Sequence, residues 1–292
     1  MKIVIADNME MDVVAEIRKL GHVVLAPNDI LAEIKDAEIL VVRSSTQVAG
    51  KLLSHAHKLR IVARAGVGLD NVDKAACEKR GIKVLNTPGA SSNAVAELAI
   101  GLMFAVSRKI AKADASMKNK TWIKKELVGT ELEGKTLGIV GLGRIGSLLA
   151  IKANALGMNI IYYDPHTSVS TLGTPVNLES IMAMSDYISL HVPLAPETRE
   201  LINPSAIAKM KKTAVLINTA RGGLVDEEAL YSAIKEGKIA GAALDVYPEE
   251  PYMGKLCELD TIVLTPHIAG NTKEAQMRIG KELVESLKKE LK

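Results

Sequence analysis

Residues 136–165, TLGIVGLGRIGSLLAIKANALGMNIIYYDP, carry the pattern that decides the fold. Gly141, Gly143 and Gly146 stand in a G-x-G-x-x-G spacing, which by itself is a weak signal. Here the glycines follow an apolar, strand-like run and open a helical segment, and a second strand-like run then ends at Asp164. This order of strand, turn, helix, strand and carboxylate is typical of a dinucleotide-binding βαβ unit.

Each part of this unit has a physical role in binding a dinucleotide. Gly141 allows the tight turn, Gly143 lets the backbone approach the pyrophosphate, and Gly146 lets helix and strand pack closely. The helix N-terminus offers unpaired amides to the phosphates. Asp164 is placed to accept hydrogen bonds from the ribose hydroxyls, and its charge would repel a 2′-phosphate, so the pattern predicts NAD rather than NADP. The alternative is a purely structural turn followed by an aspartate that begins a loop.

Short β-branched runs alternate with helical patterns on both sides of this unit. The runs lack strict alternation of apolar and polar residues, which is typical of parallel sheets covered on both faces. The sequence therefore predicts an α/β fold with two doubly wound parallel-sheet domains. The strand-like runs are 2–6, 22–26, 38–44, 59–66 and 82–89 in the first series, and 136–143, 158–164, 187–193, 214–222, 241–247 and 261–267 in the second.

Two helical segments need a separate interpretation. Residues 93–117 read as one long helix whose first half is apolar on nearly every face. Such a helix must be buried, either between domains or against another copy of the chain. Residues 273–292 form an amphipathic pattern that follows the second series of strands but could pack on the first domain.

Composition narrows the class of protein. The chain has 292 residues, 48% of them hydrophobic, which is enough for two domain cores. The net charge of +3 is spread over interleaved acids and bases, so no nucleic-acid partner is expected. Cys77 and Cys257 form no metal-ligand spacing, so we expect reduced thiols and no metal. The start of the chain lacks a signal peptide, and no apolar run reaches the roughly 20 residues of a membrane span. A cytoplasmic protein without a membrane partner is expected.

Polar residues follow three strand-like runs of the second series. Arg221, Asp245 and His267 lie at or near the ends of the runs 214–222, 241–247 and 261–267. Glu249 and Glu250 lie in the loop after Asp245. Because ligands of doubly wound sheets collect beyond the carboxyl ends of the strands, we expect these residues to line a site.

An arginine, a carboxylate and a histidine are what reversible oxidation of a 2-hydroxy acid requires. The histidine takes the hydroxyl proton as hydride leaves, and the carboxylate holds the imidazole. The arginine grips the substrate carboxylate with two parallel hydrogen bonds. Each residue alone also fits an ordinary surface role. His191, followed by Val192, ends another strand; we interpret it as a neighbour of the cofactor and a weaker rival for the base.

Motifs along nearly the whole chain resemble the D-isomer-specific 2-hydroxyacid dehydrogenase family. Within this family they are most similar to the branch that oxidises 3-phospho-D-glycerate in serine biosynthesis. Their order along the chain is highly specific. The motifs are VVRSSTQV (41–48), ARAGVGLDNVD (63–73), NTPGASSNAVAELAIGLM (86–103), GKTLGIVGLGRIG (134–146), NTARGGLVDEEAL (218–230), GAALDVYPEEP (241–251) and TPHIAGNTKEAQ (265–276).

The resemblance implies roles for individual residues. It implies Arg221, Glu250 and His267 as the catalytic set, with Glu250 chosen over Glu249 because it precedes Pro251. The remaining roles that it implies are contact of Asp245 with the nicotinamide carboxamide, of Arg144 and Ile145 with the pyrophosphate, and of Thr219, Ala220 and Gly270 with the nicotinamide.

The resemblance also implies a discontinuous first domain. Residues 1–92 and 271–292 would form a substrate-binding domain of the flavodoxin type, and residues 93–270 an inserted NAD-binding Rossmann domain. The two crossings would act as a hinge whose closure excludes water. The long helix from Asn93 would lie in a homodimer interface of the NAD-binding domain.

Substrate contacts follow from the same likeness. The family binds the substrate carboxylate partly through backbone amides, here those of Val67 and Gly68, where glycines permit close approach. A phosphate would need further cations. Arg43, after a strand of the first domain, is the first candidate, and Lys124 or Lys125 is the second. A solvated lysine pair is the alternative for the latter.

The working hypothesis is therefore NAD-dependent oxidation of 3-phospho-D-glycerate to 3-phosphohydroxypyruvate. The nearest alternative is a reductase of hydroxypyruvate, glyoxylate or another small 2-keto acid on the same scaffold. A third is an NAD-sensing binding protein, as the corepressors of this family are. Because the sequence stops at Lys292 without the serine-binding module of many relatives, we expect no serine feedback through such a module.

Overall fold

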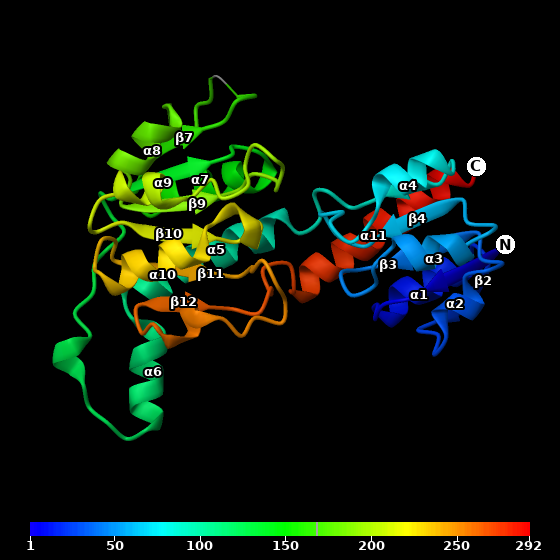
Figure 1. Cartoon of the computed structure of the whole chain (residues 1–292), viewed down its shortest axis with the longest axis horizontal. Coiled ribbons are helices and arrows are strands. Elements are labelled where there is room, and N and C mark those ends of the chain that lie inside the picture. The colour runs from blue at the N-terminus through cyan, green and yellow to red at the C-terminus, as the bar shows by residue number, and fades with distance from the viewer. Residues whose placement is uncertain (168) are drawn as a thin grey trace. The chain divides into compact units, whose positions relative to one another are not determined.

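The computed structural model describes residues 1–167 and 169–292. The chain divides into two units, residues 1–91 with 270–292 and residues 92–269 (Figure 1). We call them unit 1 and unit 2. Each crossing lies one residue earlier than the expected domain boundary.

Unit 1 is built on a five-stranded parallel sheet. Its strand order is β2-β1-β3-β4-β5. The chain adds β2 on one side of β1 and β3 to β5 on the other, so the switch point lies between β1 and β3. The central strand β3 is buried at every position, as its run of Ile, Leu and Val predicts. The strands are β1 (Lys2–Ile5), β2 (His22–Leu25), β3 (Ile39–Val42), β4 (Ile61–Arg64) and β5 (Lys83–Leu85), and the helices are α1 (Met11–Arg18), α2 (Ile30–Glu33), α3 (Gly50–His55), α4 (Lys74–Lys79) and α11 (Lys273–Glu290).

The last helix, α11, completes the core of unit 1. It begins after Thr272, whose side chain accepts a hydrogen bond from the Ala275 amide, 3.1 Å away. Its apolar stripe packs against α1 and the sheet, with Leu283 and Leu287 fully buried. Gly280 approaches α1 so closely that an added Cβ would lie 2.1 Å from a Val13 methyl. The chain therefore returns to its first unit after the second sheet is finished.

Unit 2 contains a seven-stranded parallel sheet of order β12-β11-β10-β9-β6-β7-β8. The chain starts in the middle, runs outward through β7, and resumes beside β6 with β9, so the switch point lies between β6 and β9. The predicted α/β fold of two parallel sheets is confirmed, although the sequence did not predict the short β8. The strands are β6 (Thr136–Val140), β7 (Asn159–Tyr163), β8 (Thr174–Pro175), β9 (Tyr187–Leu190), β10 (Val215–Asn218), β11 (Gly241–Leu244) and β12 (Ile262–Leu264).

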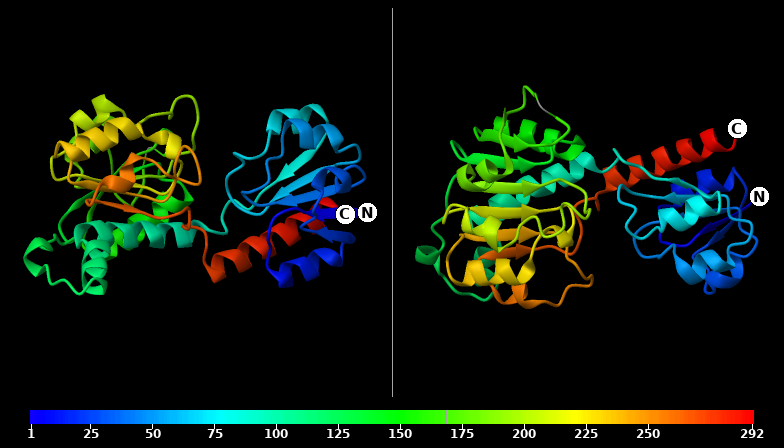
Figure 2. Two further views of the ribbon diagram at one scale, coloured as in Figure 1. Left: turned by 60° about the horizontal axis from the view of Figure 1, so that its bottom comes forward. Right: turned by 45° about the horizontal axis from the view of Figure 1, so that its top comes forward.

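Helices cover both faces of this sheet (Figure 2). One buried cluster joins the sheet to α5 and α7, and another joins it to α8, α9 and α10. The α-helices of unit 2 are α5 (Ser92–Ser107), α6 (Ile110–Lys118), α7 (Arg144–Ala155), α8 (Leu178–Met184), α9 (Pro204–Ala208) and α10 (Glu227–Lys235), and the 3-10 turns are η1 (Lys124–Glu126), η2 (Gly222–Leu224) and η3 (Lys255–Glu258).

The prediction of one continuous helix over residues 93–117 is wrong. The helix breaks between α5 and α6, where Lys109 has a left-handed backbone with φ of 51°. The apolar part, α5, packs on α7 and on β10 to β12 within unit 2, with Ala96, Ala99 and Met103 fully buried. Packing inside the unit therefore buries one side of this helix and leaves Leu98, Ile100 and Phe104 half-buried.

Candidate active site

The glycine turn lies at the switch point of unit 2, between the carboxyl ends of β6 and β9. Gly141 has φ of 95°, and an added Cβ would lie 2.7 Å from the carbonyl oxygen of His191. A Cβ on Gly146 would lie 2.1 Å from the carbonyl oxygen of Gly141. Around Gly143, no atom of the described residues lies within 4 Å of such a Cβ. The first and third glycines thus make the turn possible, and the second leaves its backbone open to a ligand at the N-terminus of α7.

Asp164 anchors this turn from the end of β7. One carboxylate oxygen accepts a hydrogen bond from the Leu142 amide at 2.7 Å, and the other accepts one from the His166 amide at 2.7 Å. The carboxylate is half-buried and each oxygen has further lone pairs for hydroxyl donors. The turn, the helix N-terminus and this carboxylate fit the pyrophosphate and ribose of a dinucleotide.

His191 lies beside the turn but is poorly suited to proton transfer at neutral pH. Its Nε2 lies 2.8 Å from the Ser189 hydroxyl, and its Nδ1 is buried without a hydrogen-bond partner among residues 1–167 and 169–292. Burial lowers the pKa of His191 from 6.5 to about 4. A base with such a pKa is nearly always neutral at pH 7 and binds a proton only weakly. The histidine is therefore a neighbour of the turn rather than a good candidate for the base.

This buried histidine should make stability depend on pH. The folded chain keeps the ring neutral down to about pH 4, whereas the unfolded chain protonates it below pH 6.5. The unfolded state binds more protons in this window, so stability is lost as the pH falls. We expect this group to cost about 2 kcal/mol between about pH 7.5 and about pH 5.

Urea unfolding of wild type and His191→Gln at both pH values measures this contribution. The variant should lose less stability on acidification than wild type does. His166→Gln, a change at an exposed histidine of the same unit, should behave like wild type. Equal acid sensitivity of wild type and His191→Gln would contradict the prediction.

Three adjacent strands of unit 2 end in the polar residues predicted from the sequence. Strands β10, β11 and β12 are parallel neighbours, so their carboxyl ends meet at one edge of the sheet. Arg221 follows β10, Asp245 directly follows β11, and His267 follows β12. The sheet therefore brings together the loops that carry Arg221, Asp245 and His267, although each residue is more than 20 positions from the next in sequence.

His267 and Glu250 form a pair across two of these loops. The imidazole Nδ1 lies 2.8 Å from a carboxylate oxygen of Glu250. The other oxygen of Glu250 accepts a hydrogen bond from the Tyr247 amide at 3.2 Å, which orients the carboxylate. His267 has a left-handed backbone with φ of 53°, and its side chain is 47% exposed. With Nδ1 held by the carboxylate, Nε2 is the nitrogen left to exchange a proton with a substrate.

Asp245 is fully buried and holds the loop that carries His267. One carboxylate oxygen accepts hydrogen bonds from the Thr265 hydroxyl at 2.6 Å and the Ile268 amide at 2.9 Å. The other accepts one from the Ala269 amide at 2.8 Å. The residue has no exposed surface. In this structure its carboxylate therefore positions the histidine loop, and it offers no exposed atom for the expected contact with the nicotinamide carboxamide.

Arg221 belongs to a loop that packs tightly against the loop after β11. The Asn218 side chain donates a hydrogen bond to the Arg221 carbonyl at 2.8 Å, and the guanidinium donates one to the Ala220 carbonyl at 2.6 Å. A Cβ on Gly222 would lie 1.9 Å from the Tyr247 backbone, so only glycine fits there. The Arg221 and Glu250 loops are thus fixed to each other by backbone contact.

Tyr247 is a supporting residue that the sequence analysis missed. Its hydroxyl lies 3.1 Å from the Leu244 carbonyl and 3.0 Å from the Thr265 carbonyl, which share its one hydrogen, and its ring stacks on Tyr252 at 4.2 Å. Burial raises the pKa of its phenol, so the group stays a donor. Only its position in the motif with Asp245 could have indicated this role.

Most of the other residues predicted to bind the cofactor follow β10, begin α7 or lie beside the glycine turn. Thr219 is buried at the end of β10, with its hydroxyl unpaired among the described residues. Arg144 is exposed and Ile145 half-buried in the first turn of α7, and Val192 lies against Gly141. Gly270 lies beside Ser91 and belongs to unit 1, one residue beyond the end of unit 2.

The predicted substrate residues of unit 1 follow two neighbouring strands. Arg43 directly follows β3, and Val67 and Gly68 lie in the loop after β4. The Val67 carbonyl accepts a hydrogen bond from the Asn86 side chain at 2.7 Å. In unit 2, Lys124 is exposed in η1, and no hydrogen bond or ion pair within the described part of the chain connects it to the three strand-end loops.

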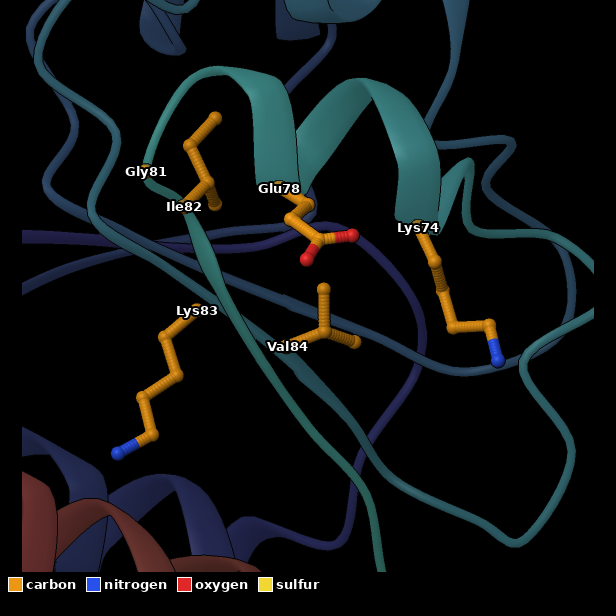
Figure 3. A pocket seen from close by; sticks show the side chains of 6 residues that line it. All are labelled: Lys74, Glu78, Gly81, Ile82, Lys83 and Val84. Atoms are coloured by element: carbon orange, nitrogen blue, oxygen red, sulfur yellow. The ribbon is translucent and has the colours of Figure 1, made fainter.

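One shallow hollow of about 360 Å³ lies elsewhere in unit 1, between α4 and the edge strand β5 (Figure 3). Lys74, Glu78 and Lys83 line it, and Lys83 is paired with Glu290 at 2.5 Å. None of the predicted site residues lines this hollow, so we assign it no role.

The fold, the glycine turn and the polar residues at the ends of β10 to β12 define a class of protein. Unit 2 is a dinucleotide-binding domain with a histidine–carboxylate pair and an arginine at neighbouring strand ends, as in dehydrogenases of small acids. The sequence model of a protein family, the NAD-binding domain of D-isomer-specific 2-hydroxyacid dehydrogenases, matches residues 100–269.

Two curated relatives extend the similarity over the whole chain. D-3-phosphoglycerate dehydrogenase of Methanocaldococcus jannaschii is 46% identical over 301 residues, covering 100% of this chain and 57% of the relative. Hydroxypyruvate reductase of Thermotoga maritima is 50% identical over 272 residues, covering 91% of this chain and 89% of the relative. The chain thus spans little more than half the length of the first relative.

A solved structure agrees with these relatives. D-lactate dehydrogenase of Aquifex aeolicus, complexed with NAD and lactic acid, has a TM-score of 0.88 and 30% identity, covering 100% of this chain and 95% of that one. This chain belongs to the family of D-isomer-specific 2-hydroxyacid dehydrogenases. The matched domain and the fit of the glycine turn identify NAD or NADP as the cofactor of unit 2.

Among residues 1–167 and 169–292, none of the helices combines the length and apolar character that crossing a membrane requires. The same residues contain no cluster of His, Cys, Asp and Glu side chains arranged to hold a metal ion.

Proposed function

We propose that the protein oxidises 3-phospho-D-glycerate to 3-phosphohydroxypyruvate with NAD, the first step of serine biosynthesis. The observation that supports this most is the 2.8 Å contact between His267 and Glu250 on loops next to that of Arg221. The name and 46% identity of the Methanocaldococcus jannaschii relative support the choice of substrate.

The proposed reaction assigns each residue one task. NAD supplies an acceptor for the hydride that leaves C2 of the substrate. His267 takes the proton of the C2 hydroxyl at Nε2 while the C2–O bond becomes a carbonyl. Glu250 keeps the ring oriented and stabilises the imidazolium that results. Arg221 binds the substrate carboxylate through its planar guanidinium.

The residues of unit 1 are proposed to recognise the rest of the substrate. The amides of Val67 and Gly68 are assigned to the substrate carboxylate, and Arg43 is assigned to the phosphate. Arg43 is preferred over Lys124 because a guanidinium matches phosphate geometry and the loop of Arg43 is held by buried side chains, whereas η1 is exposed.

A second candidate is reduction of hydroxypyruvate or glyoxylate. The Thermotoga maritima relative favours it, because it is 50% identical and the aligned region covers 89% of its length. Rates with phosphoglycerate, glycerate, lactate and glyoxylate, each with its oxidised or reduced partner, separate the two. Our proposal requires kcat/KM to be highest for the phosphorylated pair. A higher value for hydroxypyruvate would favour the reductase, and binding of NADH without turnover of any pair would favour an NAD-sensing protein.

The choice of NAD over NADP depends on Asp164. Asp164→Ala should raise the ratio of NADP to NAD activity, because the repulsion of a 2′-phosphate is removed. The carboxylate also anchors the turn through Leu142, so both absolute rates should fall. This loss is common to both cofactors and cancels in the ratio of the two kcat/KM values. An unchanged ratio would exclude the ribose assignment.

A homodimer through unit 2 also stays a proposal. Exposed apolar side chains follow one another along α6 and the segment after it, namely Ile110, Met117, Trp122 and Val128. Light scattering of the purified protein gives its mass in solution, and a monomer would exclude the dimer.

A further inference from the structure

Two buried side chains hold the loop that carries Arg43. Asp7, which is 8% exposed, accepts hydrogen bonds from the Arg43 amide at 2.6 Å and the Thr46 amide at 3.3 Å. Its second oxygen accepts one from the Thr46 hydroxyl at 2.6 Å. Three donors of one short loop thus converge on a single carboxylate.

Asn71 holds the same loop through its carbonyl groups. Its side chain is 7% exposed and donates hydrogen bonds to the Arg43 carbonyl at 2.9 Å and the Thr46 carbonyl at 2.7 Å. The amide and the carbonyl of Arg43 are therefore both fixed, each by a different buried side chain. Its guanidinium donates to the Asn8 carbonyl at 3.1 Å.

The position of this arrangement in the sheet indicates a ligand. Asp7 follows β1 and Arg43 follows β3, and the switch point of unit 1 lies between these two strands. Ligands of doubly wound sheets bind at such points. In unit 2, Asp245 accepts three hydrogen bonds from the loop of His267 in the same manner. Each unit thus uses a buried aspartate to fix the loop of a proposed functional side chain.

We propose that Asp7 and Asn71 are positioning residues that determine selectivity for a phosphorylated substrate. The inference rests on the proposed function, in which Arg43 binds the phosphate. A guanidinium whose backbone is fixed loses little conformational freedom when it binds a phosphate oxygen, so affinity is gained only for substrates that carry the phosphate. Substrates without it do not depend on this loop.

Kinetics of Asp7→Asn with phosphorylated and unphosphorylated substrates test the proposal. Asparagine keeps the shape but removes the negative charge that faces all three donors, and its NH₂ group cannot accept from the Thr46 hydroxyl, so the hold on the loop is weakened. We expect KM for 3-phosphoglycerate to rise about tenfold or more. In contrast, kcat and KM for glycerate should stay within about twofold of the wild-type values. Asn71→Ala, which removes the bonds on the other side of the loop, should act in the same direction.

The matched control is Asp73→Asn in the same unit. Asp73 accepts one hydrogen bond, from the Ala76 amide at 2.9 Å, and caps α4. Asparagine caps helices as well as aspartate does, so both KM values should stay at the wild-type level. A urea-unfolding curve for every variant shows whether the fold is preserved.

Two results would overturn the inference and differ from failure of the proposed function. Equal rises in KM for both substrates in Asp7→Asn, with reduced stability, would mean that Asp7 only supports the fold. A tenfold effect of Arg43→Ala on KM for phosphoglycerate without an effect of Asp7→Asn would refute the positioning role alone. No effect of Arg43→Ala would refute the phosphate anchor in the proposed function, and the inference with it.

Discussion

Replacing His267 with alanine is expected to lower turnover by about 10²–10⁴-fold, the range for loss of a general acid or base. The imidazole is the group whose free nitrogen can take the hydroxyl proton, since its Nδ1 is held at 2.8 Å by Glu250. NADH binding should stay intact, because the glycine turn and Asp164 lie at other strand ends. Stopped-flow or steady-state rates, together with NADH fluorescence titration, measure the two quantities.

A second variant at this position keeps the test independent of backbone strain. His267 has a left-handed backbone, which asparagine tolerates better than alanine does. His267→Asn should therefore lose turnover as His267→Ala does, with less effect on stability. His57→Ala, at an exposed histidine of unit 1, should leave turnover unchanged. If NADH affinity falls together with turnover, the residue is structural and the assignment as base is wrong.

Replacing Gly146 with alanine should lower both stability and NADH affinity. The added Cβ would lie 2.1 Å from the carbonyl oxygen of Gly141, so α7 must move away from β6. Such overpacking typically costs about 1–3 kcal/mol. The N-terminal amides of α7 would shift with the helix, and we expect the dissociation constant for NADH to rise about tenfold or more, which corresponds to about 1.4 kcal/mol.

Gly143→Ala separates ligand contact from packing. No atom of the described residues lies within 4 Å of its added Cβ, and its φ of −72° suits alanine, so stability should be unchanged. NADH affinity should still fall, because the methyl group would occupy the space that the pyrophosphate approaches. Gly101→Ala is the control. Gly101 lies within α5, and no atom of the described residues lies within 4 Å of its added Cβ, so this variant should lower neither stability nor NADH affinity. Wild-type NADH affinity of Gly143→Ala would exclude the proposed pyrophosphate position.

The sequence determined the order of elements and the chemistry of the candidate site. Strand-forming runs and the glycine turn depend on neighbours a few residues away, so patterns such as TLGIVGLGRIG indicated them. The break at Lys109 was missed because both segments are helical in pattern, and only the packing of α5 inside unit 2 shows where the helix must end.

Only the tertiary structure showed which polar residues at strand ends support a neighbouring loop. Asp245 and Asp7 both follow strands, as Arg221 does, and the sequence cannot tell that both carboxylates are satisfied by loops that lie 20 to 39 residues further along the chain. A carboxylate can be buried only where the sheet brings hydrogen-bond donors to it, and this depends on the tertiary structure. The type of side chain at a strand end is read directly from the sequence. For this reason the sequence indicated candidates for the reacting groups, and the folded structure showed which buried side chains hold their loops.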